Sequence, residues 1–202
     1  LLMLAGIAGC EKSSSNNLKP AGDEILTKEL NQFTKEDLKR LRVLVKTDYG
    51  DFVIAFYPEQ AELMVKNFVK LVREGFYDGL SFHMIIPNYM IIGGDPEETG
   101  GGGPGYWLTP QYNNLPHIRG AVGMSHPPFE PDRIGSQFYV MVRDSHIKSN
   151  AYPVFGYVES GMDTVDRIGE VPSSGFKTKP PWKPEVKVKI QDMVLMVVEE
   201  RK

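Results

Sequence analysis

The sequence predicts a mainly β fold: a closed eight-stranded antiparallel barrel with two helices, preceded by an N-terminal helical arm. Short apolar runs recur along the chain and are separated by turns rich in glycine and proline, a pattern typical of strands. Two longer stretches place apolar residues at helical spacing instead. So many short strands with two helices favour a closed barrel over an open sheet. Because 41% of the 202 residues are hydrophobic, one sizeable core is expected, in a single domain over residues 43–202.

The first ten residues predict an exported protein with a lipid anchor. Residues 1–9 are apolar, are too few to span a bilayer and resemble the end of a secretory signal. The run Ile7-Ala8-Gly9-Cys10 resembles a bacterial lipobox, in which Cys10 is lipidated; a stray cysteine in apolar sequence is the alternative. Residues 11–22 are polar and rich in Ser and Asn, as expected of a flexible tether. We therefore expect a membrane-anchored lipoprotein of the bacterial cell envelope, with its domain in the periplasm.

Residues 23–42 are predicted to form the helical arm. Thr34-x-x-Asp37 resembles a capping signal, which predicts two short helices with a break near Phe33. The arm can pack on its own domain or present a face to a partner, and the sequence leaves both open. Its apolar residues, at roughly helical spacing among charges, are Ile25, Leu26, Leu30, Phe33, Leu38 and Leu41.

The elements of the main domain can be placed in order. Val43–Thr47 and Phe52–Tyr57 alternate around a polar turn and predict a hairpin. From Glu59 to Glu74 apolar residues recur at helical spacing, and Gly75 ends this core-facing helix. The loop Pro172–Pro184 holds too much proline for the interior of a sheet. Further strands are expected at Arg119–Met124, Ser136–Val142, Tyr152–Val158 and Val186–Val198, with a short helix over Met162–Ile168.

The stretch Ser81–Asp95 predicts two strands around a reversal at Pro87-Asn88, and it is unusual for a half-buried hairpin. Met84-Ile85-Ile86 and Tyr89-Met90-Ile91-Ile92 offer no polar position, so both faces of these strands must be covered. One face can be the barrel core. The other is either a groove for an apolar ligand or a surface covered by another segment of the chain.

Composition argues against several classes of function. A net charge of −3 without strong blocks gives no basic face for nucleic acid. Four scattered histidines and one cysteine give no metal-ligand spacing, so neither a metal nor a cofactor is expected. The glycine run Gly100–Gly103 lacks the Lys-Ser or Lys-Thr of a phosphate-binding loop. His83 is expected to be a core or edge histidine with satisfied hydrogen bonds.

Three ordered motifs resemble one family. They are Phe82-His83-x-Ile85-Ile86-Pro87-x-Tyr89-Met90-x-x-Gly93-Gly94-Asp95, Gly135-Ser136-Gln137-Phe138-Tyr139-Val140 and Val154-Phe155-Gly156-Tyr157-Val158. Together they resemble the cyclophilins, the barrel-shaped peptidyl-prolyl cis-trans isomerases, over roughly residues 44–198. The glycine-rich run that ends in Pro104-Gly105-Tyr106 also resembles a loop of bacterial cyclophilins.

The resemblance implies a site. Rotation about a prolyl bond must overcome about 18 to 20 kcal/mol, because the amide resonance is broken. A catalyst needs an apolar pocket for the proline ring, polar groups that hold the flanking backbone, and a donor that favours the twisted amide. By resemblance, the residues that bind substrate are Met84, Tyr89, Met90, Ile92, His126, Gln137, Tyr139, Ile147 and Tyr152; barrel packing is the alternative for the apolar ones.

The donor is where this sequence departs from the family. Met84 occupies the slot of the family's catalytic arginine, and Ile92 the slot of the glutamine that supports it. Methionine cannot donate a hydrogen bond, so weak isomerase activity is expected. Three arginines could supply the missing donor, and the one nearest in sequence to Gly135-Ser136-Gln137 is Arg133; the other two are Arg119 and Arg143.

These observations predict a peptidyl-prolyl cis-trans isomerase that assists the folding of exported proteins. We expect proline-containing polypeptides as partners, a membrane reached through the lipid, no nucleic acid, and a monomer. One alternative is a binding module that holds proline-containing or apolar segments without isomerising them. Another is a structural lipoprotein whose groove is filled by its own 23–42 arm.

Overall fold

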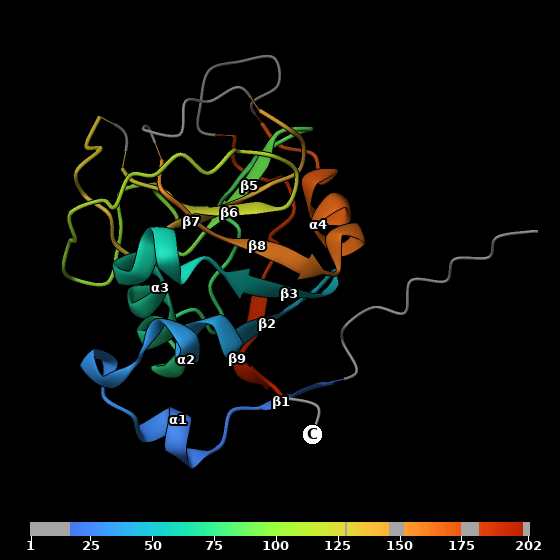
Figure 1. Ribbon diagram of the computed structural model, residues 1–202. Helices are drawn as coiled ribbons and strands as arrows, with labels where there is room; N and C mark the ends of the chain where they lie inside the picture. Colours follow the sequence, from blue (N-terminus) through green and yellow to red (C-terminus); the bar gives the residue numbers. More distant parts are fainter. Residues whose placement is uncertain (1–16, 128, 146–151, 175–181, 200–202) are drawn as a thin grey trace, which may run out of the picture.

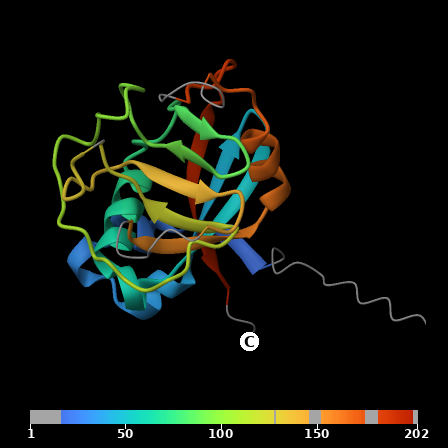
Figure 2. The ribbon, with the colours of Figure 1, turned by 90° about the horizontal axis from the view of Figure 1, so that it is seen from above.

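One antiparallel sheet organises the molecule, with helices at its sides (Figure 1). The computed structural model describes residues 17–127, 129–145, 152–174 and 182–199. Within these ranges α3 and α4 lie on opposite sides of the strands, as Figure 2 also shows. The strands are β1 (Leu18–Pro20), β2 (Leu41–Thr47), β3 (Gly50–Phe56), β4 (Met84–Ile86), β5 (Met90–Gly93), β6 (Ala121–Met124), β7 (Phe138–Met141), β8 (Val154–Ser160) and β9 (Ile190–Val198), and the helices are α1 (Asp23–Thr27), the 3-10 turn η2 (Leu30–Gln32), α2 (Lys35–Arg40), α3 (Pro58–Arg73) and α4 (Met162–Gly169).

The predicted closed barrel of eight strands is corrected to an open sheet of nine, in the order β1-β9-β2-β3-β8-β6-β7-β5-β4. The chain just before β4 approaches the start of β9. Ser81 and Lys189 form an isolated bridge there, and backbone hydrogen bonds join residues 79–82 to residues 188–190, but β4 itself does not pair with β9. The outer edge of β4 is taken by a loop instead, because the Ile85 N–H donates to the Trp182 carbonyl at 3.0 Å. Among the described strands, no ladder therefore joins β4 to β9 or to β1, and the sheet is not closed into a barrel.

The ninth strand comes from the predicted tether. Leu18–Pro20 form β1, whose register pairs Leu18 with Val198 on β9. Residues 17–22 are thus part of the folded domain, and the flexible tether predicted over 11–22 is wrong for this end. A short extended segment beside an exposed edge strand gains backbone hydrogen bonds, which composition alone does not reveal.

Residues 23–42 were predicted as an arm of two short helices with a break near Phe33; in the structure they form α1, η2 and α2, and the last two residues already belong to β2. Thr34 caps α2, and its capping box with Asp37 is present. Phe33, Leu38 and Leu41 are buried in the main core. The segment therefore packs on its own domain rather than standing apart from it.

The hairpin and both predicted helices of the main domain are confirmed. β2 and β3 pair in register across the turn at 48–49. α3 buries the predicted Met, Phe and Val stripe, which meets Phe155 of β8 through the ring of Phe68. The last strand begins later than expected, at Ile190, because Val186 is exposed and only Val188 continues the buried alternation.

The strands from Ser81 to Asp95 present apolar side chains on both faces, as their composition predicted. Ile85, Ile91 and Val140 point into the main core beneath α3. Their neighbours along the strands, Met90 and Ile92, belong to a second apolar cluster on the opposite face. This second face carries the candidate site.

Candidate functional site

A groove with a volume of about 410 Å³ opens on the second apolar face of β4, β5 and β7. It is mostly apolar, and none of the described residues that line it is Asp, Glu, Lys or Arg. Pockets of this size and character bind small ligands and short peptide segments. Its described lining residues are His83, Met84, Ile86, Tyr89, Met90, Ile92, Thr99, Gly100, Ser125, His126, Phe129, Gln137, Tyr139, Tyr152 and Trp182.

The floor of the groove is a row of side chains across neighbouring strands. Met84 on β4 lies opposite Ile92 on β5, and Ile92 lies opposite Tyr139 on β7. Directly opposite residues on a sheet face are close enough for their side chains to touch. Met84 and Ile92, which the sequence resemblance placed in the slots of an arginine and a glutamine, are therefore a cross-strand pair, and both present apolar atoms.

Tyr139 fills the far end of this row. Its partner on β6 is Gly123, and a Cβ built on that glycine would lie 2.1 Å from the Tyr139 hydroxyl oxygen. The hydroxyl is buried and has no hydrogen-bond partner in the described part of the chain. Burial raises the pKa of this phenol well above its usual value, so it stays protonated.

The glycine-rich loop forms one wall of the groove, and hydrogen bonds to two buried polar side chains hold it in place. The buried Asp95 carboxylate accepts backbone hydrogen bonds from Glu97, Thr99 and Gly100. Gln137 Nε2 donates to the carbonyls of Gly100 at 3.0 Å and Gly102 at 2.9 Å. Since both its N–H groups are used in this way, Gln137 can offer a peptide only its acceptor oxygen.

His126 and Tyr152 form the opposite wall. Their rings stack with centroids 4.6 Å apart and an interplanar angle of 3°. His126 Nδ1 lies 2.8 Å from the Pro127 carbonyl, which assigns the proton to Nδ1 and leaves Nε2 as an acceptor in the neutral ring. The two residues expected to hold the peptide backbone, Gln137 and His126, thus both present acceptors.

His83 does not behave as predicted. It is 5% exposed and lines the groove, yet neither ring nitrogen has a hydrogen-bond partner among the described residues. Burial lowers the pKa of its imidazole, and the charges of Asp95 and Glu98 oppose this effect only partly. The expectation of a histidine with satisfied hydrogen bonds is wrong.

The predicted substitute donors lie elsewhere. Arg133 pairs with Glu130 and stacks on the ring of Trp107, with its guanidinium carbon 4.1 Å from the ring centroid. Arg119 forms two hydrogen bonds to Asp166 on α4. Arg143 lies in a separate hollow beside Arg119. None of the three lines the groove.

Two predicted site residues, Cys10 and Ile147, lie outside the described residues. The other expected substrate-binding residues all line the groove: Met84, Tyr89, Met90, Ile92, His126, Gln137, Tyr139 and Tyr152. Among the described ranges no helix has the length and apolarity needed to span a membrane. In those same ranges, no group of three or more His, Cys, Asp or Glu side chains could hold a metal ion.

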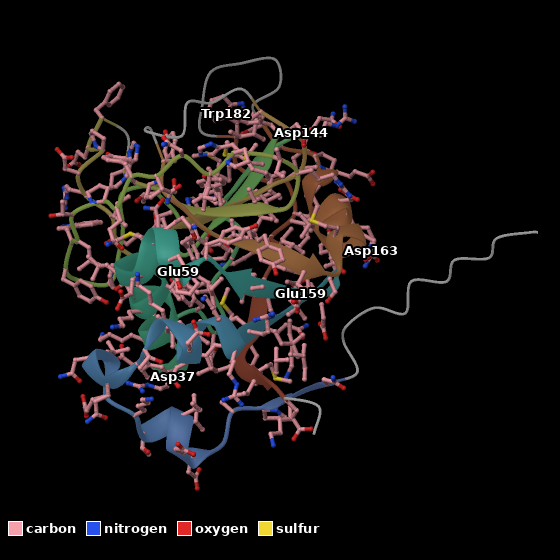
Figure 3. All side chains as sticks on the ribbon, in the orientation of Figure 1. Asp37, Glu59, Asp144, Glu159, Asp163 and Trp182 are labelled. Carbon is pink, nitrogen blue, oxygen red and sulfur yellow. The ribbon has the colours of Figure 1, made fainter. Side chains whose placement is uncertain are left out.

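Sequence reasoning missed several lining residues, chiefly His83, Phe129 and Trp182. Trp182 is one of two tryptophans and falls in the proline-rich loop; Figure 3 places it at the opposite end of the molecule from Asp37. Phe129 is fully exposed, with a positive φ of 66°. An isolated large aromatic residue in a polar or proline-rich loop was the available signal, since such residues are otherwise costly to expose.

The chain is similar to known proteins over most of its described length. Residues 42–194 match the family model "Cyclophilin type peptidyl-prolyl cis-trans isomerase/CLD". Peptidyl-prolyl cis-trans isomerase B of Bacillus subtilis is 43% identical over 109 residues, which cover 53% of this chain and 75% of that protein. A peptidyl-prolyl cis-trans isomerase of Helicobacter pylori is 35% identical over 150 residues, which cover 72% of this chain and 90% of that protein.

A solved structure is similar to this chain in its fold. It is a cyclophilin type peptidyl-prolyl cis-trans isomerase of Cryptosporidium parvum, determined in the presence of the dipeptide Ala-Pro, with a TM-score of 0.68 and 28% identity. The match covers 79% of this chain and 99% of that one. With the family motifs arranged around one apolar groove, the chain belongs to the cyclophilin type peptidyl-prolyl cis-trans isomerases.

Proposed function

We propose that the groove binds proline-containing segments of exported polypeptides and isomerises their prolyl bonds slowly. The single observation that carries this proposal is the row Met84, Ile92 and Tyr139, an apolar floor without a charged donor. Such a floor accepts a proline ring, while acceptors on Gln137 and His126 face the peptide N–H groups on either side. The Ala-Pro dipeptide in the Cryptosporidium parvum structure supports this class of ligand.

Weak turnover follows from the same row. The family resemblance puts an arginine at the position of Met84, and a thioether has no proton to donate to the prolyl nitrogen. Loss of one preorganised donor typically costs about 2.7 to 4 kcal/mol, or roughly a hundred- to a thousandfold in rate.

A binding module without catalysis is the second candidate, and the uncharged groove favours it. Such a protein would hold proline-containing or apolar segments and release them unchanged. The third possibility, a groove filled by residues 23–42, is not supported, since none of these residues lines the groove.

Exchange spectroscopy by NMR on an Ala-Pro peptide separates the first two candidates, because it reports binding and interconversion on one sample. We expect binding with slow interconversion for the natural sequence. The double variant Met84→Arg, Ile92→Gln should raise the interconversion rate by roughly a hundred- to a thousandfold, since it restores a donor and its supporting amide.

Leu63→Arg is the matched control, because it adds the same charge at an exposed position on α3 outside the groove. It should leave the rate unchanged. Binding with no interconversion above the thermal rate would support the binding module instead. Absence of both binding and interconversion in the natural sequence would reject both candidates.

We also propose that Cys10 carries a lipid that holds the domain at a bacterial envelope membrane. Ile7-Ala8-Gly9-Cys10 and the polar residues that follow support this assignment. Mass spectrometry of the full-length protein, compared with a Cys10→Ala variant, should find acyl chains only when Cys10 is present.

A further inference from the structure

His83 is a buried polar side chain of the groove whose ring nitrogens have no hydrogen-bond partner among the described residues. It immediately precedes Met84, and like Met84 it lines the groove. Buried polar groups in native proteins nearly always have a partner, so a histidine with both nitrogens unpaired needs an explanation. A ligand that occupies the groove provides one.

The protonation state of the His83 ring allows it to donate a hydrogen bond. Desolvation keeps the imidazole neutral near neutral pH, and a neutral imidazole offers one N–H donor and one acceptor nitrogen. The charged groups that face His83 are Asp95 and Glu98. Asp95 already accepts hydrogen bonds from the glycine-rich loop, and Glu98 is bound by Ser81 and Lys187, so neither is paired with the ring.

Three other polar side chains of the groove are less suited to this role. The N–H groups of Gln137 and His126 are directed to carbonyls of the protein itself. The Tyr139 hydroxyl has no partner either, but it packs over Gly123 at the far end of the row from Met84. His83 remains as the unpaired donor adjacent in sequence to the position where the family has its arginine.

We propose that His83 donates a hydrogen bond to the prolyl segment in the groove and replaces part of the function of the missing arginine. This inference rests on the proposed function, because it names the group that acts on the same ligand. It predicts a conflict between stability and activity. In the free protein the buried ring has no partner among the residues that the structure describes, and a bound peptide would relieve that penalty.

The test compares His83→Met with His83→Gln. These side chains have similar length and flexibility, but only glutamine keeps an N–H donor. Unfolding of the free protein, affinity for an Ala-Pro peptide and the rate of prolyl interconversion are measured on each full-length variant. His83→Met should unfold at the same or a higher denaturant concentration, while affinity or interconversion falls about three- to tenfold. His83→Gln should retain more of both.

Two further variants test whether the Tyr139 hydroxyl or a donor at position 84 acts on the same peptide as His83. Tyr139→Phe removes the other unpaired hydroxyl and should affect interconversion less than His83→Met. In a Met84→Arg background the guanidinium supplies the donor, so His83→Met should then cost less than it does beside Met84. Nonadditivity of this kind indicates that the two groups share one role.

The outcomes distinguish this inference from the proposed function. If His83→Met binds and isomerises the peptide as well as the natural sequence does, the role of His83 is overturned and the proposed function stands. Equal losses in His83→Met and His83→Gln, with both variants destabilised, would show that the ring acts only in packing. Natural protein that neither binds nor isomerises the peptide would overturn both.

Discussion

Gly123 leaves space on β6 for the ring of Tyr139, which lies on the neighbouring strand. The nearest Tyr139 atoms are 2.1 to 2.6 Å from the position that a Cβ on Gly123 would take. The tyrosine is 2% exposed and meets Ile92 on its other side, so it has little freedom to move. A residue without a side chain therefore fixes the depth of the groove.

Gly123→Ala should push the Tyr139 ring toward the groove and destabilise the protein by about 1 to 3 kcal/mol, the usual cost of overpacking. Affinity for a proline-containing peptide should fall as well. Chemical denaturation and a peptide titration measure the two effects. Gly101→Ala is the control, since its nearest contact would be an ordinary 3.6 Å and its stability change should stay within about 0.5 kcal/mol. Equal effects of both substitutions would contradict this account of Gly123.

At the scale of elements, α2 shows how a short helix is held at its start. Thr34 and Asp37 form its capping box, and Lys28 donates to the Asp37 carboxylate at 2.6 Å. The Lys28 ammonium and the Thr34 backbone N–H hold the pKa of Asp37 at about 2, below its usual 3.8. The capping signal was readable from sequence because it is local. The contact of Lys28 with Asp37 was not readable from the sequence, because a loop brings Lys28 back to the start of the helix.

A carboxylate with a lowered pKa stabilises the fold above its unfolded-state pKa and loses this contribution as the pH falls toward 2. Asp37→Asn should therefore flatten the loss of stability between about pH 4 and pH 2, by less than about 1 kcal/mol because the ion pair is partly exposed. Urea denaturation at a series of pH values measures this. Lys28→Met removes the larger cause of the lowered pKa, so the loss of stability should be smaller and should be complete at a higher pH than in the natural sequence. Unchanged profiles in both variants would argue against the pair.

At the scale of the whole molecule, charge is separated from the groove. The protein carries a net charge of −3, but its charged side chains lie outside the described groove lining. Recognition there depends on apolar contact and on hydrogen bonds, which act over short distances. Long-range steering of a charged client toward the groove is weak as a result.

Affinity for a neutral proline-containing peptide should change less than about threefold between about 0.01 M and 1 M salt, although the Debye length falls from about 30 Å to about 3 Å over that range. Calorimetric titration at several salt concentrations measures this. Glu or Lys beside the proline should alter the salt dependence only slightly. A tenfold loss with salt would indicate that a charged group reaches the peptide.

The sequence by itself determined the local elements, the family and most of the groove. Met84, Tyr89 and Gln137 were found because they lie within contiguous motifs, and the helices and the β2–β3 hairpin because periodicity records which face is buried. Only the tertiary structure decided the strand added by Leu18–Pro20, the end of the sheet at β4 and the positions of the arginines. It also decided that His83 lines the groove and that its ring nitrogens find no partner in the described part of the chain. These features depend on contacts between segments far apart in the chain, and no local pattern of residues specifies which polar group will find a partner.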